Sequence, residues 1–164
     1  MPSKSPEKLS KPAVNSQVIM TQLVLPSHTN ALGSVFGGTI MSWIDIAAAI
    51  AAQRHCNKDV VTASIDRLDF VAPVYKGWVV NLRASVNYTS RTSMEVGVRV
   101  DAENPKTGET FHTASAYTTF VALGSNGKPA EVPELILEND DERRRYDEAK
   151  KRREQRLNNR NRKP

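Results

Sequence analysis

Apolar and polar residues alternate with a period of two along much of the chain, which is the pattern of β-strands with one buried face. The alternation predicts a first strand at residues 17–25, and then four further strands at 60–71, 78–88, 94–101 and 110–123. Between the last two strands, the residues Asn-Pro-Lys-Thr-Gly at 104–108 predict a hairpin turn.

A helical period replaces this alternation between residues 38 and 54. The apolar residues predicted to form its buried stripe are Ile40, Trp43, Ile44, Ala47, Ile50 and Ala51. The many alanines would let the helix lie very close to a sheet that curls around it. Alanine is also simply a good helix former, so both interpretations fit the run.

The order of strand, helix and four strands, joined by short connections, predicts an α+β domain. We expect a five-stranded antiparallel sheet with one face packed against the long helix and the other face more polar and open. Such a sheet exposes an edge strand. A homodimer that extends the sheet would cover this edge.

The two ends of the chain differ in composition from its middle. Residues 1–15 repeat Pro, Ser and Lys and predict a disordered N-terminal arm. The folded domain is expected at 16–127, followed by a charged, partly helical tail at 128–164. In this tail the residues able to face a core are Tyr146, Ala149 and Leu157. A solvated helix and a weak contact with an acidic or polyanionic partner both fit its composition.

The distribution of charge argues against a nucleic-acid-binding protein. The net charge is +5, but residues 138–164 alone hold 11 Lys and Arg against 7 Asp and Glu. The basic character therefore belongs to the tail, where no aromatic interleaving supports base stacking. The single cysteine, Cys56, excludes an internal disulfide and fits a reducing, cytoplasmic compartment. No apolar run predicts a secretion signal or a membrane span.

Asp45 is the most informative residue, because it interrupts the apolar helix between Ile44 and Ile46. A carboxylate in such surroundings costs free energy unless a partner satisfies it, and one held in a cleft can act as a general base. Gly37 and Gly38 stand where the helix should begin and leave backbone N–H groups free to meet a developing oxyanion. This arrangement is suited to the hydrolysis of an acyl group.

Three stretches carry a resemblance to a known family. Residues 25–38 read Leu-Pro-Ser-His-Thr-Asn-Ala-Leu-Gly-Ser-Val-Phe-Gly-Gly and run into Met-Ser-Trp-Ile-Asp at 41–45. Val-Thr-Ala-Ser-Ile-Asp-Arg-Leu-Asp-Phe follows at 61–70, and Ser-Arg-Thr-Ser-Met-Glu-Val at 90–96. Together they resemble the hot-dog-fold acyl-CoA thioesterases, with the YciA-like bacterial enzymes and the mammalian cytosolic acyl-CoA hydrolases as the nearest group.

The resemblance implies a hot-dog fold and a homodimer with active sites at the subunit interface, assembled further into a hexamer as a trimer of dimers. It implies that Asp45 activates water or attacks the thioester of acyl-CoA directly. It also implies that Asn30 is contributed by the partner subunit and that the Gly38 N–H meets the thioester oxygen. No cofactor is expected, since coenzyme A is part of the substrate.

Further residues are expected to bind substrate, namely Gly37, Thr62, Ser64, Arg91, Thr92 and Ser93. Residues 91–93 occupy a strand connection that by resemblance touches the CoA phosphates. Regular alternation puts Thr62 and Ser64 on the same strand face as Asp66, within hydrogen-bonding reach of the site. The side chains expected to shape the wall of the acyl tunnel are Val35, Phe36, Ile40 and Met41.

Each of these residues also has a purely structural interpretation. Asp45 would then be a helix carboxylate bonded to Thr62 or Ser64, Asn30 would shape its loop, and the two glycines would form only a tight turn. Cys56 is expected to be a small residue at a helix end rather than a nucleophile. The three histidines and one cysteine show no metal-ligand spacing, so no metal site is predicted.

Two other functions remain open from the sequence. A non-catalytic acyl-CoA-binding or sensing module would share the fold, but the retention of Asp45 and Asn30 favours chemistry. A hot-dog dehydratase would need a site histidine with an acidic partner, and the loop before the helix offers only His28. A Ser-His-Asp hydrolase has no support, because no Gly-x-Ser-x-Gly elbow is present.

Overall fold

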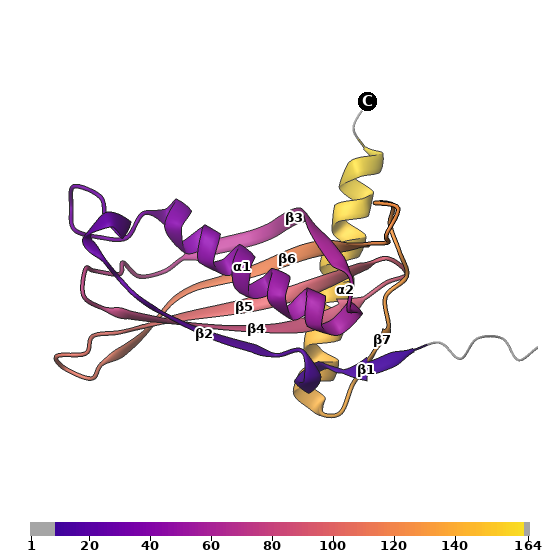
Figure 1. Ribbon diagram of the computed structural model, residues 1–164, viewed down its shortest axis with the longest axis horizontal. Coiled ribbons are helices and arrows are strands. Elements are labelled where there is room, and N and C mark those ends of the chain that lie inside the picture. Colours follow the sequence, from indigo (N-terminus) through magenta and orange to yellow (C-terminus); the bar gives the residue numbers. More distant parts are fainter. Residues whose placement is uncertain (1–8, 163–164) are drawn as a thin grey trace, which may run out of the picture.

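The main sheet of the protein is a five-stranded antiparallel layer wrapped around one long helix (Figure 1). The computed structural model describes residues 9–162. The five strands, in the spatial order β2-β4-β5-β6-β3, are β2 (Val18–Leu23), β4 (Val79–Thr89), β5 (Ser93–Glu103), β6 (Thr110–Leu123) and β3 (Asp59–Phe70). The helix is α1 (Gly37–Cys56). This architecture confirms the predicted α+β hot-dog fold.

The alanine face of α1 explains how the sheet can approach the helix so closely. Ala47, Ala48, Ala51 and Ala52 are all fully buried, and they face the strands β4 and β5 in the centre of the sheet. The inner sheet face supplies the rest of the core through buried residues such as Val80, Leu82, Val96, Val100 and Phe120. Small side chains on the helix and branched ones on the strands therefore fill the space between them.

The ends of the predicted elements shift by only a few residues. The helix runs two residues beyond the predicted end and stops at Asn57, which adopts the left-handed conformation at φ 52°. The strand at 110–123 has its predicted bounds. The hairpin turn also forms, with the Gly108 N–H donating to the Asn104 carbonyl at 2.8 Å. These elements can be predicted from the sequence because the hydrophobic periodicity and the turn residues indicate the same boundaries.

The segment before β2 differs from the mobile arm expected there. Residues 1–8 of that arm lie outside the described residues. Strand β1 (Ser10–Pro12) pairs in parallel with β7 (Glu134–Ile136), and the short helix η1 (Ala13–Asn15) leads into β2. A second short helix, η2 (Pro26–His28), begins the loop between β2 and α1. The small β1–β7 sheet holds the N-terminal segment against the connection that precedes the last helix.

The outer face of the sheet is covered in part by the helix α2 (Asp140–Asn161), which corrects the expectation of an open face (Figure 1). The helix begins at Asn139, whose side chain accepts a hydrogen bond from the Glu142 N–H at 2.9 Å. Ala149 of this helix is buried, and its Tyr146 packs on Tyr88 of β4 with ring centroids 4.8 Å apart. Most of its remaining contacts with the sheet are made by arginines.

Candidate functional site

Asp45 and Thr62 form the centre of the candidate site. Asp45 lies in the third turn of α1, and its Oδ1 accepts a hydrogen bond of 2.8 Å from the Thr62 hydroxyl of β3. Ile44 beside it is buried in the core, whereas Asp45 itself is partly exposed and Ile46 is largely exposed. The carboxylate therefore sits at the border between the core and an open surface, held by a neutral donor. One of its oxygens is left for another partner.

The start of α1 offers unfilled N–H groups, as the two glycines predict. Phe36 precedes the helix and contributes no side-chain cap. The amides of Thr39 and Ile40 are bonded to the Phe36 carbonyl, so the N–H groups of Gly37 and Gly38 come before the first helical hydrogen bonds. Both glycines are exposed. A partial positive charge at this helix end favours an anionic oxygen.

Asn30 shapes the loop that leads to the helix. Its Oδ1 accepts hydrogen bonds from the Leu32 N–H at 2.9 Å and from the Ser34 N–H at 3.3 Å. Its Nδ2 lies 3.1 Å from the Ser34 hydroxyl. The Ser34 hydroxyl also donates to Oδ1, at 3.2 Å. Within residues 9–162 none of these bonds joins Asn30 to Asp45, and together they fix the side chain in its own loop.

Ser64 does not accompany Thr62, and the prediction that they share a face is wrong. Thr62 lies opposite Phe120 of β6, whereas Ser64 lies opposite Thr119, the next residue along that strand. A β-bulge at Ala63 inserts one extra residue and turns Ser64 to the outer face. There its hydroxyl lies 3.5 Å from Asp66, on the side of the sheet away from Asp45.

The turn at residues 91–93 lies far along the sheet from the Asn30 loop. The Arg91 and Thr92 carbonyls accept hydrogen bonds from Val132 and Ala122, near β7. The Asn30 loop adjoins the other end of the strands, where the Lys76 N–H bonds to the Gly33 carbonyl. Within one chain the structure therefore places this turn apart from the start of α1 (Figure 1).

An apolar hollow of about 340 Å³ opens beside the start of α1. Its wall includes Val35 and Ile40, two of the residues expected to form the acyl tunnel. It also includes Phe70, whose ring would lie 3.5 Å from a Cβ added to Gly37. The sequence analysis did not assign Phe70 to the site. In the sequence, Phe70 is visible only as an aromatic residue at the end of a strand, shortly before Pro73. That pattern alone does not indicate a site residue.

The other titratable residues considered in the sequence lie where they support the fold. Cys56 is buried, burial raises the pKa of its thiol, and its Sγ lies 3.7 Å from the Lys58 carbonyl, which suits a structural residue. His55 is fully buried and its Nε2 donates to the Pro133 carbonyl at 2.9 Å. Across residues 9–162, His, Cys, Asp and Glu nowhere gather in threes that could hold a metal ion. Neither helix in that range is long and apolar enough to cross a membrane.

Comparison with known proteins places this fold in one family. The model of the thioesterase superfamily matches residues 32–109. The acyl-CoA thioester hydrolase YkhA of Bacillus subtilis, itself uncharacterized, is 42% identical over 143 residues, which cover 87% of this chain and 83% of the relative. The chain belongs to the thioesterase superfamily.

A longer relative and a solved structure add to this finding. The cytosolic acyl coenzyme A thioester hydrolase of Rattus norvegicus is 40% identical over 82% of this chain, which spans only 36% of the rat protein. The crystal structure of an apo-hexameric acyl-CoA thioesterase superposes with a TM-score of 0.89 at 43% identity, covering 92% of this chain and 97% of the other.

Proposed function

We propose that this protein hydrolyses acyl-CoA thioesters to free coenzyme A and a carboxylic acid. The observation that carries the proposal is the Asp45 carboxylate, bonded to Thr62 at 2.8 Å and partly open to the surface two turns inside α1. The family relatives named acyl-CoA thioester hydrolases support the choice of substrate.

The reaction needs two groups that the site provides. Asp45 can remove a proton from a water that attacks the thioester carbonyl, or it can attack that carbon itself and form an anhydride that water resolves. As the carbonyl oxygen gains negative charge, the Gly38 N–H at the positive end of α1 can donate a hydrogen bond to it. The carbon–sulfur bond then breaks and CoA leaves as a thiolate, which needs no strong acid.

A complete site requires a second subunit under this proposal. Within residues 9–162 no bond joins Asn30 to the Asp45 of the same chain, and the family resemblance assigns this asparagine to the partner subunit. We infer that its amide acts beside the Asp45 of a partner and orients the water or the carbonyl. Strand β3 is an edge of the sheet and carries Thr62, which makes this edge the natural seam of a homodimer. The hexameric thioesterase structure supports an assembly of six chains, and we propose that it is a trimer of such dimers.

The proposal assigns two further parts of the complex. The apolar hollow beside Gly37 would take the acyl chain. By the family resemblance, residues 91–93 of one subunit would meet the CoA phosphates. No cofactor takes part in this mechanism. The rat relative, named as cytosolic, and the single buried cysteine both support a cytoplasmic location.

The test is CoA release from short, medium and long acyl-CoAs by wild type and Asp45→Ala. Wild type is expected to turn over, and the variant to lose activity while it keeps the same assembly. Asp147→Ala provides a matched control, because Asp147 is an exposed aspartate on α2. If wild type binds acyl-CoA but releases no CoA at any chain length, the non-catalytic binding module becomes the better account.

A further inference from the structure

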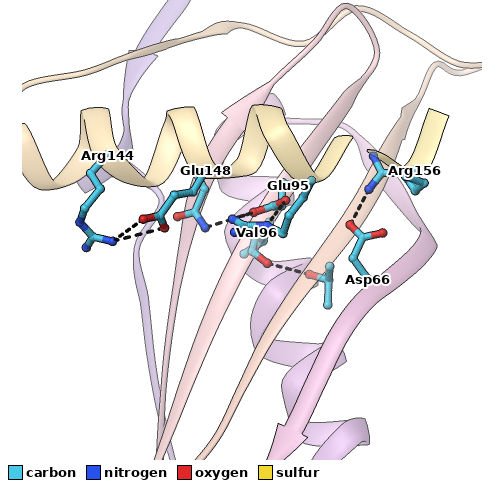
Figure 2. A network of polar contacts seen from close by, with 9 residues as sticks. Asp66, Glu95, Val96, Arg144, Glu148 and Arg156 are labelled. Atoms are coloured by element: carbon cyan, nitrogen blue, oxygen red, sulfur yellow. Dashed lines mark hydrogen bonds and ion pairs between the residues drawn. The ribbon is translucent and has the colours of Figure 1, made fainter. Parts of the chain in front are cut away.

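Helix α2 meets the strands of the sheet one after another in their spatial order. Near its start Tyr146 packs on β4, and one turn and a half later Arg152 bonds to Glu95 of β5 at 2.7 Å. The Arg152 guanidinium also lies 3.7 Å from the ring centroid of Tyr117 of β6. Arg156, one turn further on, bonds to Asp66 of the edge strand β3 (Figure 2). The helix therefore crosses the outer face and meets β3 last.

The helix does not end where the sheet ends. Residues 157–161, called here the α2 tip, remain helical beyond Arg156. At a rise of about 1.5 Å per residue the tip is roughly 7 Å long, whereas neighbouring strands lie about 4.8 Å apart. The tip is thus long enough to lie over one more strand placed beside β3. Figure 1 shows this end of α2 projecting beyond the strands.

The edge that the tip overhangs is long and is unpaired in one chain. Strand β3 has 12 residues and forms ladder bonds on one side only, with β6. Ile65 remains 36% exposed, and Val61 is 48% exposed opposite Val121, on the outer face. Natural proteins rarely leave such an edge uncovered. The tip itself presents Leu157, which is 37% exposed.

We propose that the α2 tip grips a second copy of this chain across β3. This inference rests on the homodimer of the proposed function and adds an interface element to it. A second β3 beside the first would lie beneath the tip, and its outer face carries an exposed Val61. Because a two-fold axis makes the contact reciprocal, each dimer would have two such grips.

A photo-crosslinking amino acid in place of Arg160 tests this contact directly. After irradiation, chains of twice the monomer mass are expected, with the crosslinked peptide coming from β3 or β6 of the other copy. The same group in place of Lys150, an exposed position before the tip, is expected to give no crosslink to those strands. A crosslink within one chain, or to any other part of the second copy, would overturn the grip.

A substitution in the tip gives an independent measurement. Leu157→Asp is expected to weaken the dimer about tenfold in dissociation constant, as for truncation of an interface anchor. Gln155→Asp adds the same charge at an exposed position before the tip and should leave the constant unchanged. Equal dissociation constants for wild type and Leu157→Asp would contradict the grip but not the homodimer. A wild type that sediments as a monomer contradicts the homodimer itself, and with it the grip.

Discussion

At the scale of single residues, the hydroxyl of Thr62 is the only protein donor recorded for the Asp45 carboxylate within residues 9–162. This bond fixes one oxygen of Asp45 toward β3 and leaves the other without a recorded protein donor in those residues. A carboxylate held in this way has fewer orientations to lose when it meets water or a carbonyl carbon. Thr62 is therefore a positioning residue, which acts on the reaction through Asp45.

Replacing Thr62 tests this role. Thr62→Val keeps the shape but removes the hydroxyl, and hydrogen bonds to charged groups contribute about 1.5–3 kcal/mol. We expect kcat to fall by about one to two orders of magnitude, while Thr62→Ser keeps most of the activity. Steady-state kinetics with one acyl-CoA measures both. Equal activity in the valine and serine variants would show that the hydroxyl does not position Asp45.

His55 makes stability depend on pH. Burial, with a smaller contribution from Lys11, lowers the pKa of His55 below its ordinary value of 6.5, and the bond to Pro133 opposes this only in part. Below pH 6.5 His55 binds a proton in the unfolded chain more readily than in the folded chain. The free energy of unfolding is therefore highest above this pH and falls as the pH is lowered. Urea unfolding at pH 7.5 and at pH 5.5 should show a larger loss for wild type than for His55→Gln. Equal losses would assign the pH dependence to other groups.

The residues of the site differ in how far sequence alone predicts them. Asp45 was found because a charge inside an apolar helix is a local signal. Ser64 was misplaced because the bulge at Ala63 is set by how β3 pairs with β6, and regular alternation cannot reveal it. Phe70 was missed because its place beside Gly37 depends on a contact between two elements far apart in the chain.

At the scale of elements, α2 is held on the sheet by polar and aromatic contacts more than by an apolar stripe. Glu95 is almost fully buried under the helix, where it accepts hydrogen bonds from Arg152 and from Asn87. Further along the helix, Arg156 reaches the Asp66 carboxylate of β3 (Figure 2). Sequence analysis predicted the helix but not its docking. The long aliphatic stems of arginines can cover a sheet, although a helix rich in arginine has the composition of a solvated surface helix.

Breaking the Arg152–Glu95 pair should therefore destabilise the fold. Arg152→Met leaves a buried carboxylate without its main partner, and loss of one member of such a pair costs about 3 kcal/mol. Adding Glu95→Gln should recover part of this loss, because it removes the uncompensated charge. Arg143→Met is the control, since Arg143 is an exposed arginine in a surface pair with Asp140. Chemical denaturation measures all four proteins. Similar losses for Arg152→Met and Arg143→Met would mean that the buried pair does not hold α2.

At the scale of the whole molecule, one side of the single chain exposes apolar residues. Met41 and Ile46 of α1 and Ile65 of β3 are exposed apolar residues around the Asp45–Thr62 contact. The antiparallel sheet was predictable from short connections and alternation, but not its spatial order, in which β3 pairs with β6 rather than with β4, the next strand along the chain. The partner surface was predictable only as an uncovered edge, because one chain's sequence does not show which register two edges adopt. The same surface carries both the proposed dimer seam and the proposed site, so assembly and activity should be lost together.

Ile65→Asp tests this coupling. Ile65 lies on the inner face of β3 opposite Thr118, and a charge there would have to be buried in a dimer that extends the sheet. We expect monomers in sedimentation velocity and a loss of thioester hydrolysis, although Asp45, Thr62 and the start of α1 remain intact in each chain. Val14→Asp, which places the same charge at an exposed residue of η1, is expected to keep both the assembly and the rate. Monomers of Ile65→Asp with the full rate would refute the contribution of Asn30 by the partner. Intact dimers with the full rate would place the seam elsewhere.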